Sequence, residues 1–368
     1  MPLPPSADDS GAWTDDSGAL SSAGQPLHTR TVAVSVFQDE PGVLRAEGEI
    51  LDLRKAGWVP TGGTLQTAGF IHHMKLHLWV PLADGAITRV EVSQPHVPFE
   101  ARPETGGESC RDVVPRLQAL VGHSIEESFP RHLAGCFGGA LGCSHLLTLA
   151  QAMGAVVPPA LDRERAAGQR RKAGETVASR AIFLDGFGTP EGGMGVQIQL
   201  SDFATRPVVE AATPFERLLR HAEVQTRADV DLETMTIRAI EGVERIREGA
   251  AMRDDAWTDR SALLVPLVGG PALRGLAGTL FRHYGGHPDQ RLLLDAMLQF
   301  APGLIQCFAA RTGQMLARVA DARGHPPGGS DGGAPMPREL GVGGTPDSCY
   351  VWRAGGVMAR YRGPTDGG

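Results

Sequence analysis

The sequence lacks any run of 18 consecutive apolar residues, so no segment of it predicts a transmembrane helix. Residues 1–27 have neither the basic start nor the apolar stretch of a signal peptide, and their small, acidic composition predicts a disordered arm. Positive charge is not in excess: a net charge of −7 and a pI near 6.0 argue against nucleic acid or an anionic membrane as the main partner. We therefore expect a soluble, cytoplasmic protein with a small-molecule substrate, and the sequence leaves open whether it forms a homo-oligomer.

Cysteine is scarce, and its spacing does not resemble a disulfide framework. The chain has an odd set of five, namely Cys110, Cys136, Cys143, Cys307 and Cys349. This favours reduced thiols in a cytoplasm. No pair has the C-x2-C spacing of a zinc finger, and no P-loop or H-E-x-x-H motif occurs, so none of these common sites is expected.

The distribution of apolar residues predicts an α+β fold. Alternating apolar residues predict strands over 32–36 and 44–53, and a hairpin formed by 70–80 and 87–92. Helical spacing follows Ser109 and Cys143, and a further helical region over 290–320 is expected to break at Pro302. We expect an N-terminal antiparallel sheet with helices packed on it, resembling a scaffold protein, and a C-terminal α+β part. The expected boundaries are an arm at 1–28, a sheet-and-helix domain at 29–160, a linker at 161–178, a second α+β part at 179–323 and a mostly disordered tail at 324–368.

The hairpin segment "FIHHMKLHLWV" contains the first candidate site residue. His72 shares its parity with Met74 and the apolar residues that follow, so it should face the core, because successive strand side chains alternate faces. His73 should point to the other face together with Lys75.

Two cysteines are expected near helix N-termini. Cys110 lies within about one turn of a predicted helix start, and Cys143 and His145 lie in "GGALGCSHLLTLAQAM", where glycines give way to a helical pattern with Ser144 as a candidate cap. The positive end of the helix dipole favours thiolate, which is both a nucleophile and a metal ligand.

Together, His72, Cys110, Cys143 and His145 make a ligand set suited to zinc or iron. These ligands are spread over 74 positions, so the fold would have to bring them together. The alternative is that both cysteines are small buried residues and both histidines are satisfied by backbone groups.

The sequence also contains a faint internal echo. "LVGHSIEESFPRHLAGCFGG" from residue 120 resembles "LVGGPALRGLAGTLFRHYGG" from residue 267, and each leads into a Leu-rich helix. The second copy has "HPDQRLL" in place of the Cys-x-His segment. Chance similarity is the alternative explanation at this length.

At these residues the chain resembles an uncharacterised bacterial domain-of-unknown-function family. Its members have an L-x-D strand, an I-H-x-M strand, a cysteine after a proline-containing turn, L-V-G and then G-C-T-H-L. The matching segments here are Ile50-Leu51-Asp52, Ile71-His72-His73-Met74, Cys110, Leu120-Val121-Gly122 and Gly142-Cys143-Ser144-His145-Leu146. Ile50 and Ser144 replace leucine and threonine, and the turn before Cys110 is longer. The resemblance covers residues 29–155 well; it implies that the two cysteines and two histidines form a site, and it supplies no reaction.

A fainter similarity is to the U-type scaffold proteins of iron–sulfur cluster assembly. The segments "PFEARPETGGESC", "LVGHSIEE" and "GCSHLLTLA" follow the order of motifs in those proteins, although the cysteine and histidine are inverted and separated by a serine. This similarity mainly implies the fold.

Three functional hypotheses follow. The first is a zinc- or iron-dependent enzyme of the hydrolase or lyase type that acts on a small organic metabolite in bacterial catabolism, with Asp52 or His73 as a nearby acid or base. The second is a metal or iron–sulfur carrier without catalysis of its own. The third is a thiol-dependent enzyme in which Cys143 or Cys110 is the nucleophile and His145 or His72 the base.

Overall fold

The computed structural model describes residues 26–61, 64–126, 128–168, 170–189, 193–211, 213–249, 256–322, 344 and 346–361, and the structural statements below refer to these. Most of the arm expected at 1–28, and much of the tail expected at 324–368, lie outside the described residues.

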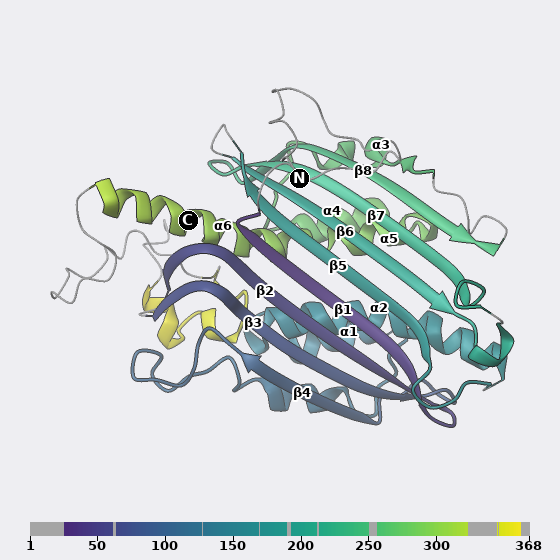
Figure 1. Ribbon diagram of the computed structural model, residues 1–368. Coiled ribbons are helices and arrows are strands. Elements are labelled where there is room, and N and C mark those ends of the chain that lie inside the picture. Colours follow the sequence, from purple (N-terminus) through teal and green to yellow (C-terminus); the bar gives the residue numbers. More distant parts are fainter. Residues whose placement is uncertain are drawn as a thin grey trace, which may run out of the picture.

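A single antiparallel sheet runs through the described part of the chain (Figure 1). Its nine strands lie in the order β4-β3-β2-β1-β5-β6-β7-β8-β9. They are β1 His28–Glu40, β2 Val43–Thr61, β3 Thr64–Pro81, β4 Arg89–His96, β5 Thr176–Gly188, β6 Met194–Thr205, β7 Leu218–Asp231, β8 Thr236–Glu248 and β9 Thr258–Asp259. The expected α+β class is confirmed.

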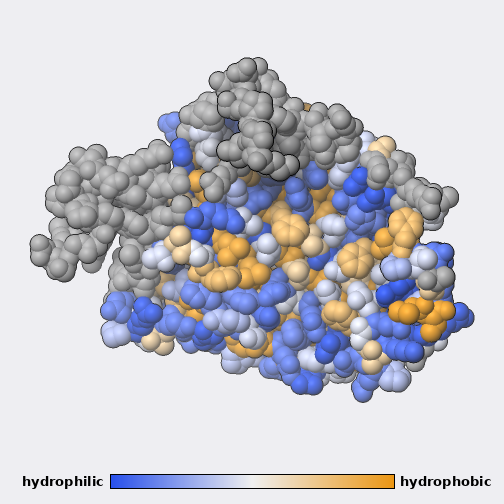
Figure 2. Space-filling model, in the orientation of Figure 1, coloured by the Kyte–Doolittle hydropathy of each residue, from blue (hydrophilic) through white to orange (hydrophobic). Residues whose placement is uncertain are grey.

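The helices pack on one face of this sheet (Figure 1). The α-helices are α1 Phe129–Phe137, α2 Ser144–Ala167, α3 Ser261–Leu264, α4 Leu276–Tyr284, α5 Arg291–Met297 and α6 Phe300–Ala322. The 3₁₀ helices are η1 Val114–Leu120, η2 Gly139–Leu141, η3 Val208–Glu210, η5 Val265–Leu267, η6 Pro288–Gln290, η8 Tyr350–Trp352 and η9 Val357–Tyr361. The opposite face of the sheet shows polar and apolar side chains intermixed (Figure 2).

The sheet has one buried and one partly exposed face because its strands alternate. In β1, Val32, Val34 and Val36 are buried, while the residues between them are more exposed. The helix that begins at Phe300 contains Pro302 in its first turn, where proline is tolerated, so the expected break at Pro302 is wrong and the chain bends just before α6 instead.

The helical stretch Pro288–Arg311 is long and apolar enough to cross a membrane by composition, but 61% of its most apolar window is buried inside the protein. It packs against the sheet through α5 and α6, as the core helix of a sheet-rich domain does.

The chain is built from two halves that repeat the same arrangement. The N-terminal half comprises β1–β4, α1 and α2, and the C-terminal half comprises β5–β8 and α4–α6. With an offset of 150 residues, the pairing of Arg30 with Asp52 becomes that of Arg180 with Asp202, and the other strand pairs correspond in the same way. β1 pairs with β5 at the centre, which joins the halves into one sheet.

The faint echo in the sequence is the helical part of this repeat. Val121 and Val268 occupy the same position after η1 and η5, and both have φ −64° and ψ 132°. The glycines that follow them, Gly122 and Gly269, both have positive φ. The segment 161–178, expected as a linker, contains the last turns of α2 and the first residues of β5.

We expect Gly303→Ala to destabilise the protein by about 1–3 kcal/mol, the usual cost of overpacking a core. A Cβ at Gly303 in α6 would lie 2.3 Å from Leu184 Cδ1, and Leu184 is buried in β5. The measurement is the urea midpoint of unfolding.

Gly278→Ala is the matched control, because Gly278 is an exposed helical glycine whose nearest neighbouring atom to an added Cβ is 3.5 Å away. This change should stabilise by about 0.5–1 kcal/mol. Equal effects of the two substitutions would contradict the close approach of α6 to β5.

Candidate metal centre

At one end of the sheet the inward-facing rows of three neighbouring strands change from apolar to polar. The row of β1 ends in Arg30 and His28, and that of β2 ends in Asp52 and Arg54. In β3 the inward row ends in His72. All five residues are buried on the face that the helices cover, and register places Asp52 between Arg30 and His72.

An irregularity in β3 helps to aim His72 inward. The pairing of β2 with β3 shifts between Asp52 and Leu53, which face His72 and Phe70, so Ile71 is an extra residue. Both Ile71 and His72 are buried although they are consecutive. Bulges of this kind redirect side chains and are frequent beside functional sites.

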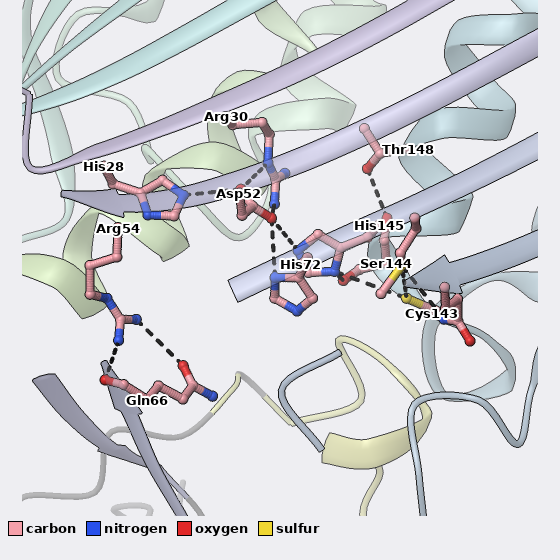
Figure 3. A network of polar contacts seen from close by, with 12 residues as sticks. His28, Arg30, Asp52, Arg54, Gln66, His72, Cys143, Ser144, His145 and Thr148 are labelled. Atoms are coloured by element: carbon pink, nitrogen blue, oxygen red, sulfur yellow. Dashed lines mark hydrogen bonds and ion pairs between the residues drawn. The ribbon is translucent and has the colours of Figure 1, made fainter. Parts of the chain in front are cut away.

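The second histidine comes from α2. Gly142 precedes the helix in an extended conformation, Cys143 occupies the N-cap position, and His145 is the second residue of the helix. Cys143, not Ser144, is therefore the capping residue, and it makes no side-chain cap. α2 lies against the N-terminal half of the sheet and carries His145 to the polar end of the strands (Figure 3).

Asp52 is the centre of the cluster (Figure 3). Its Oδ1 accepts hydrogen bonds from His28 Nε2 at 3.0 Å and from Arg30 Nε at 2.8 Å, and its Oδ2 accepts one from Arg30 Nη2 at 2.9 Å. His145 Nε2 lies 2.9 Å and His72 Nδ1 3.2 Å from the same Oδ2. The two rings are stacked with their centroids 3.6 Å apart.

The contacts of the last two histidines with Asp52 are short but poorly aligned. His72 Nδ1 and His145 Nε2 are both buried and make no hydrogen bond of good geometry, despite their short distances to Oδ2. A carboxylate offers about four lone pairs, two on each oxygen, and three of these already accept from His28 and Arg30. One lone pair of Asp52 and two imidazole nitrogens therefore converge on the same point.

The protonation states suit a cation there. Burial would raise the pKa of Asp52, but the charge of Arg30 and the neighbouring rings hold that pKa well below its usual range. Burial lowers the pKa of His72 to about 3 and also lowers the pKa of His145. At neutral pH the group is one carboxylate and two neutral imidazoles, which is the form that binds metal.

The spacing also suits a metal. Ligand atoms about 2.1 Å from a metal lie about 3.0 Å apart at a 90° angle and about 3.4 Å apart at a tetrahedral angle. The 2.9 and 3.2 Å separations around Asp52 Oδ2 are close to this range. Asp52, His72 and His145 thus form a buried group that could hold a metal ion.

A cavity of about 660 Å³ lies next to this group. Its walls are mainly apolar and include Phe99, Ile305 and Trp352, while His72 and His145 form part of its polar lining. The cavity is bounded by β3, the start of α2, α6 and the segment 346–352. A small organic molecule placed in it would meet the edges of both imidazoles.

The two cysteines of the predicted ligand set line the same cavity without joining the three ligands. Cys143 Sγ lies 4.0 Å from His145 Nδ1 and 3.8 Å from Met74 Sδ. Cys110 precedes the short helix η1 instead of opening an α-helix. Burial raises the pKa of Cys143 to about 12 and that of Cys110 well above its usual value, so burial outweighs the expected effect of helix N-termini on the thiols.

The structure separates the two residues that were expected to act as acid or base. Asp52 lies at the centre of the cluster, as a candidate ligand. His73 points to the other face of the sheet, where its Nε2 lies 2.6 Å from Glu49 Oε1.

Three basic residues of the cluster were not anticipated: Arg30, His28 and Arg54. Arg54 hydrogen-bonds the backbone oxygen and, at 3.4 Å, the Oε1 of Gln66 (Figure 3), and burial lowers its pKa to about 10. The sequence did indicate that these side chains face the core, because all three continue the every-second-residue alternation of the buried apolar residues in β1 and β2.

The metal-free protein should lose stability as the pH falls from 7.5 to 5. The folded-state pKa values of His28, His72 and His145 lie below the ordinary 6.5, so the unfolded chain binds more protons in this window. Their contribution is complete above about pH 6.5 and falls below it by up to about 1.4 kcal/mol per pH unit for each histidine. Urea unfolding in the presence of a chelator, at intervals across this range, measures the slope.

His72→Gln should reduce this slope, whereas His283→Gln, which changes an exposed histidine, should not. A slope that is unaltered in His72→Gln would show that this ring becomes protonated without cost in the folded protein.

The comparisons agree with the family resemblance. No curated protein and no solved structure matches the chain, and the similarity to iron–sulfur scaffold proteins gains no support from these comparisons. Residues 28–158, which contain Asp52, His72, Cys143 and His145, match the family described as "Protein of unknown function (DUF2889)". This match covers the segment from β1 into α2 and is to a family without an assigned function.

Proposed function

We propose that the protein is a metal-dependent enzyme that binds zinc or iron(II) through Asp52, His72 and His145. The observation that carries the proposal is the convergence of two buried, unpartnered imidazole nitrogens on the one remaining lone pair of Asp52. Two histidines and one carboxylate are the ligand set of many catalytic zinc sites and of non-haem iron sites, both of which keep open positions for water or substrate.

The substrate is proposed to be a small, largely apolar organic molecule. The adjoining cavity has the size of typical ligand sites and offers apolar walls with a few polar groups. When bound, the metal would supply a Lewis acid at the polar end of this cavity, which suits hydrolase or lyase chemistry. Arg30 and His28 hold the carboxylate plane of Asp52, and the backbone of α2 fixes the position of His145.

A carrier without catalysis is less favoured, because a carrier presents its site to a partner. The three ligands are 0%, 6% and 8% exposed, at Asp52, His72 and His145 respectively. The five free cysteines fit a reducing compartment, and the cytoplasm is the proposed location.

One observation favours a thiol enzyme as a second candidate. Cys143, His145 and Asp52 form a chain, with Sγ 4.0 Å from Nδ1 and Nε2 2.9 Å from Oδ2, which is the order of a thiol, its base and the residue that orients the base. The raised pKa of Cys143 weakens this candidate, because a nucleophilic cysteine needs a lowered one.

Protein purified without oxygen should contain close to one zinc or iron per chain by elemental analysis, and His145→Gln should lose it. We expect the metal affinity of this variant to fall by more than about 100-fold, because loss of a group that only orients a ligand already costs about 10- to 100-fold. Substitution of Asp52 is avoided, because it would leave Arg30 buried without a counter-charge.

Asp202→Asn is the matched control. It breaks the equivalent pair with Arg180 in the C-terminal half, away from the three proposed ligands, so it should destabilise the fold by about 3–5 kcal/mol and keep the metal. Absence of metal from the wild-type protein, even after incubation with zinc or iron(II), would refute the metal-dependent function.

Cobalt(II) substitution should distinguish the two candidates. Coordination by Asp52, His72 and His145 gives no thiolate-to-cobalt charge-transfer band, and Cys143→Ser should leave the visible spectrum unchanged. A charge-transfer band lost in Cys143→Ser would instead make Cys143 a ligand. Rapid inactivation by iodoacetamide together with indifference to chelators would favour the thiol enzyme.

A further inference from the structure

The two halves of the chain provide an internal comparison for each residue of the candidate metal centre. The Arg–Asp pair occurs in both halves, as Arg30 with Asp52 and as Arg180 with Asp202. Strand pairing shows that the positions equivalent to His28, Arg54 and His72 are Ala178, Ala204 and Ala222. On the helix, the position equivalent to His145 is Leu292, with the offset of 147 residues that relates α1 to α4.

The fold itself therefore does not require Arg54. The C-terminal half forms the same sheet with alanine at that position. The proposed ligands His72 and His145 are also replaced there, by Ala222 and Leu292. Arg54 belongs to the set of residues that distinguishes the half with a metal centre from the half without one.

The charges of the two clusters differ as well. In the C-terminal half, buried Arg180 is paired with two carboxylates, Asp202 and Asp295, at 2.7–2.8 Å, and Asp295 also pairs with Arg291, which is 60% exposed, so no buried positive charge is in excess there. In the N-terminal half, Arg30 and Arg54 face a single carboxylate, Asp52, and the position of Asp295 is taken by Thr148. A buried site with one excess positive charge is costly unless an anion accompanies it.

Arg54 forms no ion pair with any described residue, although it is only 2% exposed. Both of its hydrogen bonds go to Gln66, one to the backbone oxygen and one to the side-chain oxygen, and its Nε has no partner. Gln66 lines the cavity. Because Arg54 occupies the oxygen of the Gln66 amide, the amide NH₂ is left as a donor, on the side away from Arg54 (Figure 3).

The remaining charges of the cavity lie at its exposed rim and offset each other. Arg274 is an exposed cation, and Asp347 is an exposed carboxylate whose Oδ1 accepts the backbone N–H of Ala354 at 2.6 Å. The excess positive charge thus lies behind the buried end of the cavity, where Gln66 and His72 are part of the lining and Arg54 contacts Gln66 from outside it.

We infer that the molecule bound in this cavity is a carboxylate attached to a small apolar body, and that Arg54 together with Gln66 is the group that selects its negative charge. The apolar walls exclude a bare inorganic anion as the preferred ligand, because such an anion would lose its hydration without gaining contacts. A divalent metal raises the buried positive charge from one to three and strengthens the same preference. The inference rests on the proposed metal-dependent function and names its substrate class.

The test is calorimetric titration of the full-length, zinc-loaded protein with benzoate and with benzamide, which has nearly the same shape and no charge. We expect benzoate to bind at least about tenfold more tightly than benzamide, and inorganic phosphate to bind more weakly than benzoate. Arg54→Gln should reduce benzoate affinity about tenfold or more, leave benzamide affinity unchanged and retain the zinc, because Arg54 is not a ligand. Arg54→Lys, which keeps the charge on a different geometry, should retain part of the preference.

Equal binding of benzoate and benzamide to the wild-type protein would overturn the inference, and so would an unchanged benzoate affinity in Arg54→Gln. If phosphate bound as tightly as benzoate, the inference that the ligand is a carboxylate with an apolar body would be wrong. The wild-type comparison stands even if neither variant folds. A benzoate preference in a protein that takes up no metal would refute the proposed metal-dependent function and leave the anion site intact, so the two failures are distinguishable.

Discussion

The buried pair of Arg30 and Asp52 sets the geometry on which the candidate centre depends. Arg30 is almost completely buried, and an uncompensated guanidinium in that position would cost several kcal/mol. The two-point contact between the side chains fixes the plane of the carboxylate, and His28 occupies a further lone pair. One lone pair of Asp52 is left. Its direction is set by the contact of Asp52 with Arg30, and not by His72 and His145, which face it. A cation held there would therefore meet a preorganised oxygen.

The same pair in the C-terminal half shows what the scaffold does without a centre. There Asp295 from α5 supplies the second carboxylate for Arg180, so this buried guanidinium is compensated without a ligand. The C-terminal half nevertheless contributes to the cavity, because Ala301, Ile305 and Ala309 of α6 form part of its wall. Since β1 and β5 join the halves into one sheet, α6 is held over the polar end of the N-terminal half. The repeat thus yields one half that carries polar ligands and another that covers them.

The sequence predicts the parts of the site that depend on local patterns, and it does not predict the parts that depend on tertiary contacts. The parity of His72 within an apolar alternation correctly placed it inside, and the glycines before Cys143 correctly marked the start of a helix that brings His145 inward. Asp52 was singled out only as a nearby acid or base, because its role depends on register, and register places it opposite both Arg30 and His72. The thiols were expected to be thiolates from their position near helix starts, but burial dominates, and burial is a tertiary property.

In the sequence, the internal repeat can be recognised only in its turns and helices, because these constrain residue identity more than the strands do. The L-V-G turn needs a glycine at positive φ, so its sequence is constrained in both halves. Strand positions need only the correct alternation, and many residues satisfy it, so the offset of 150 residues in the sheet left no readable similarity beyond the Arg–Asp pair.

The shared use of Asp52 by Arg30 and by a metal would couple metal binding to anion binding. A carboxylate that already accepts from a guanidinium donates less electron density to a cation, so the cation would keep more of its positive charge. An anionic ligand near Arg54 and His72 would then be attracted by the metal as well as by the guanidinium. Because linkage is reciprocal, the same ligand would hold the metal more tightly by the same factor. A weakly donating carboxylate is in this sense not a defect of the centre, since it makes occupation by metal and occupation by a carboxylate depend on each other.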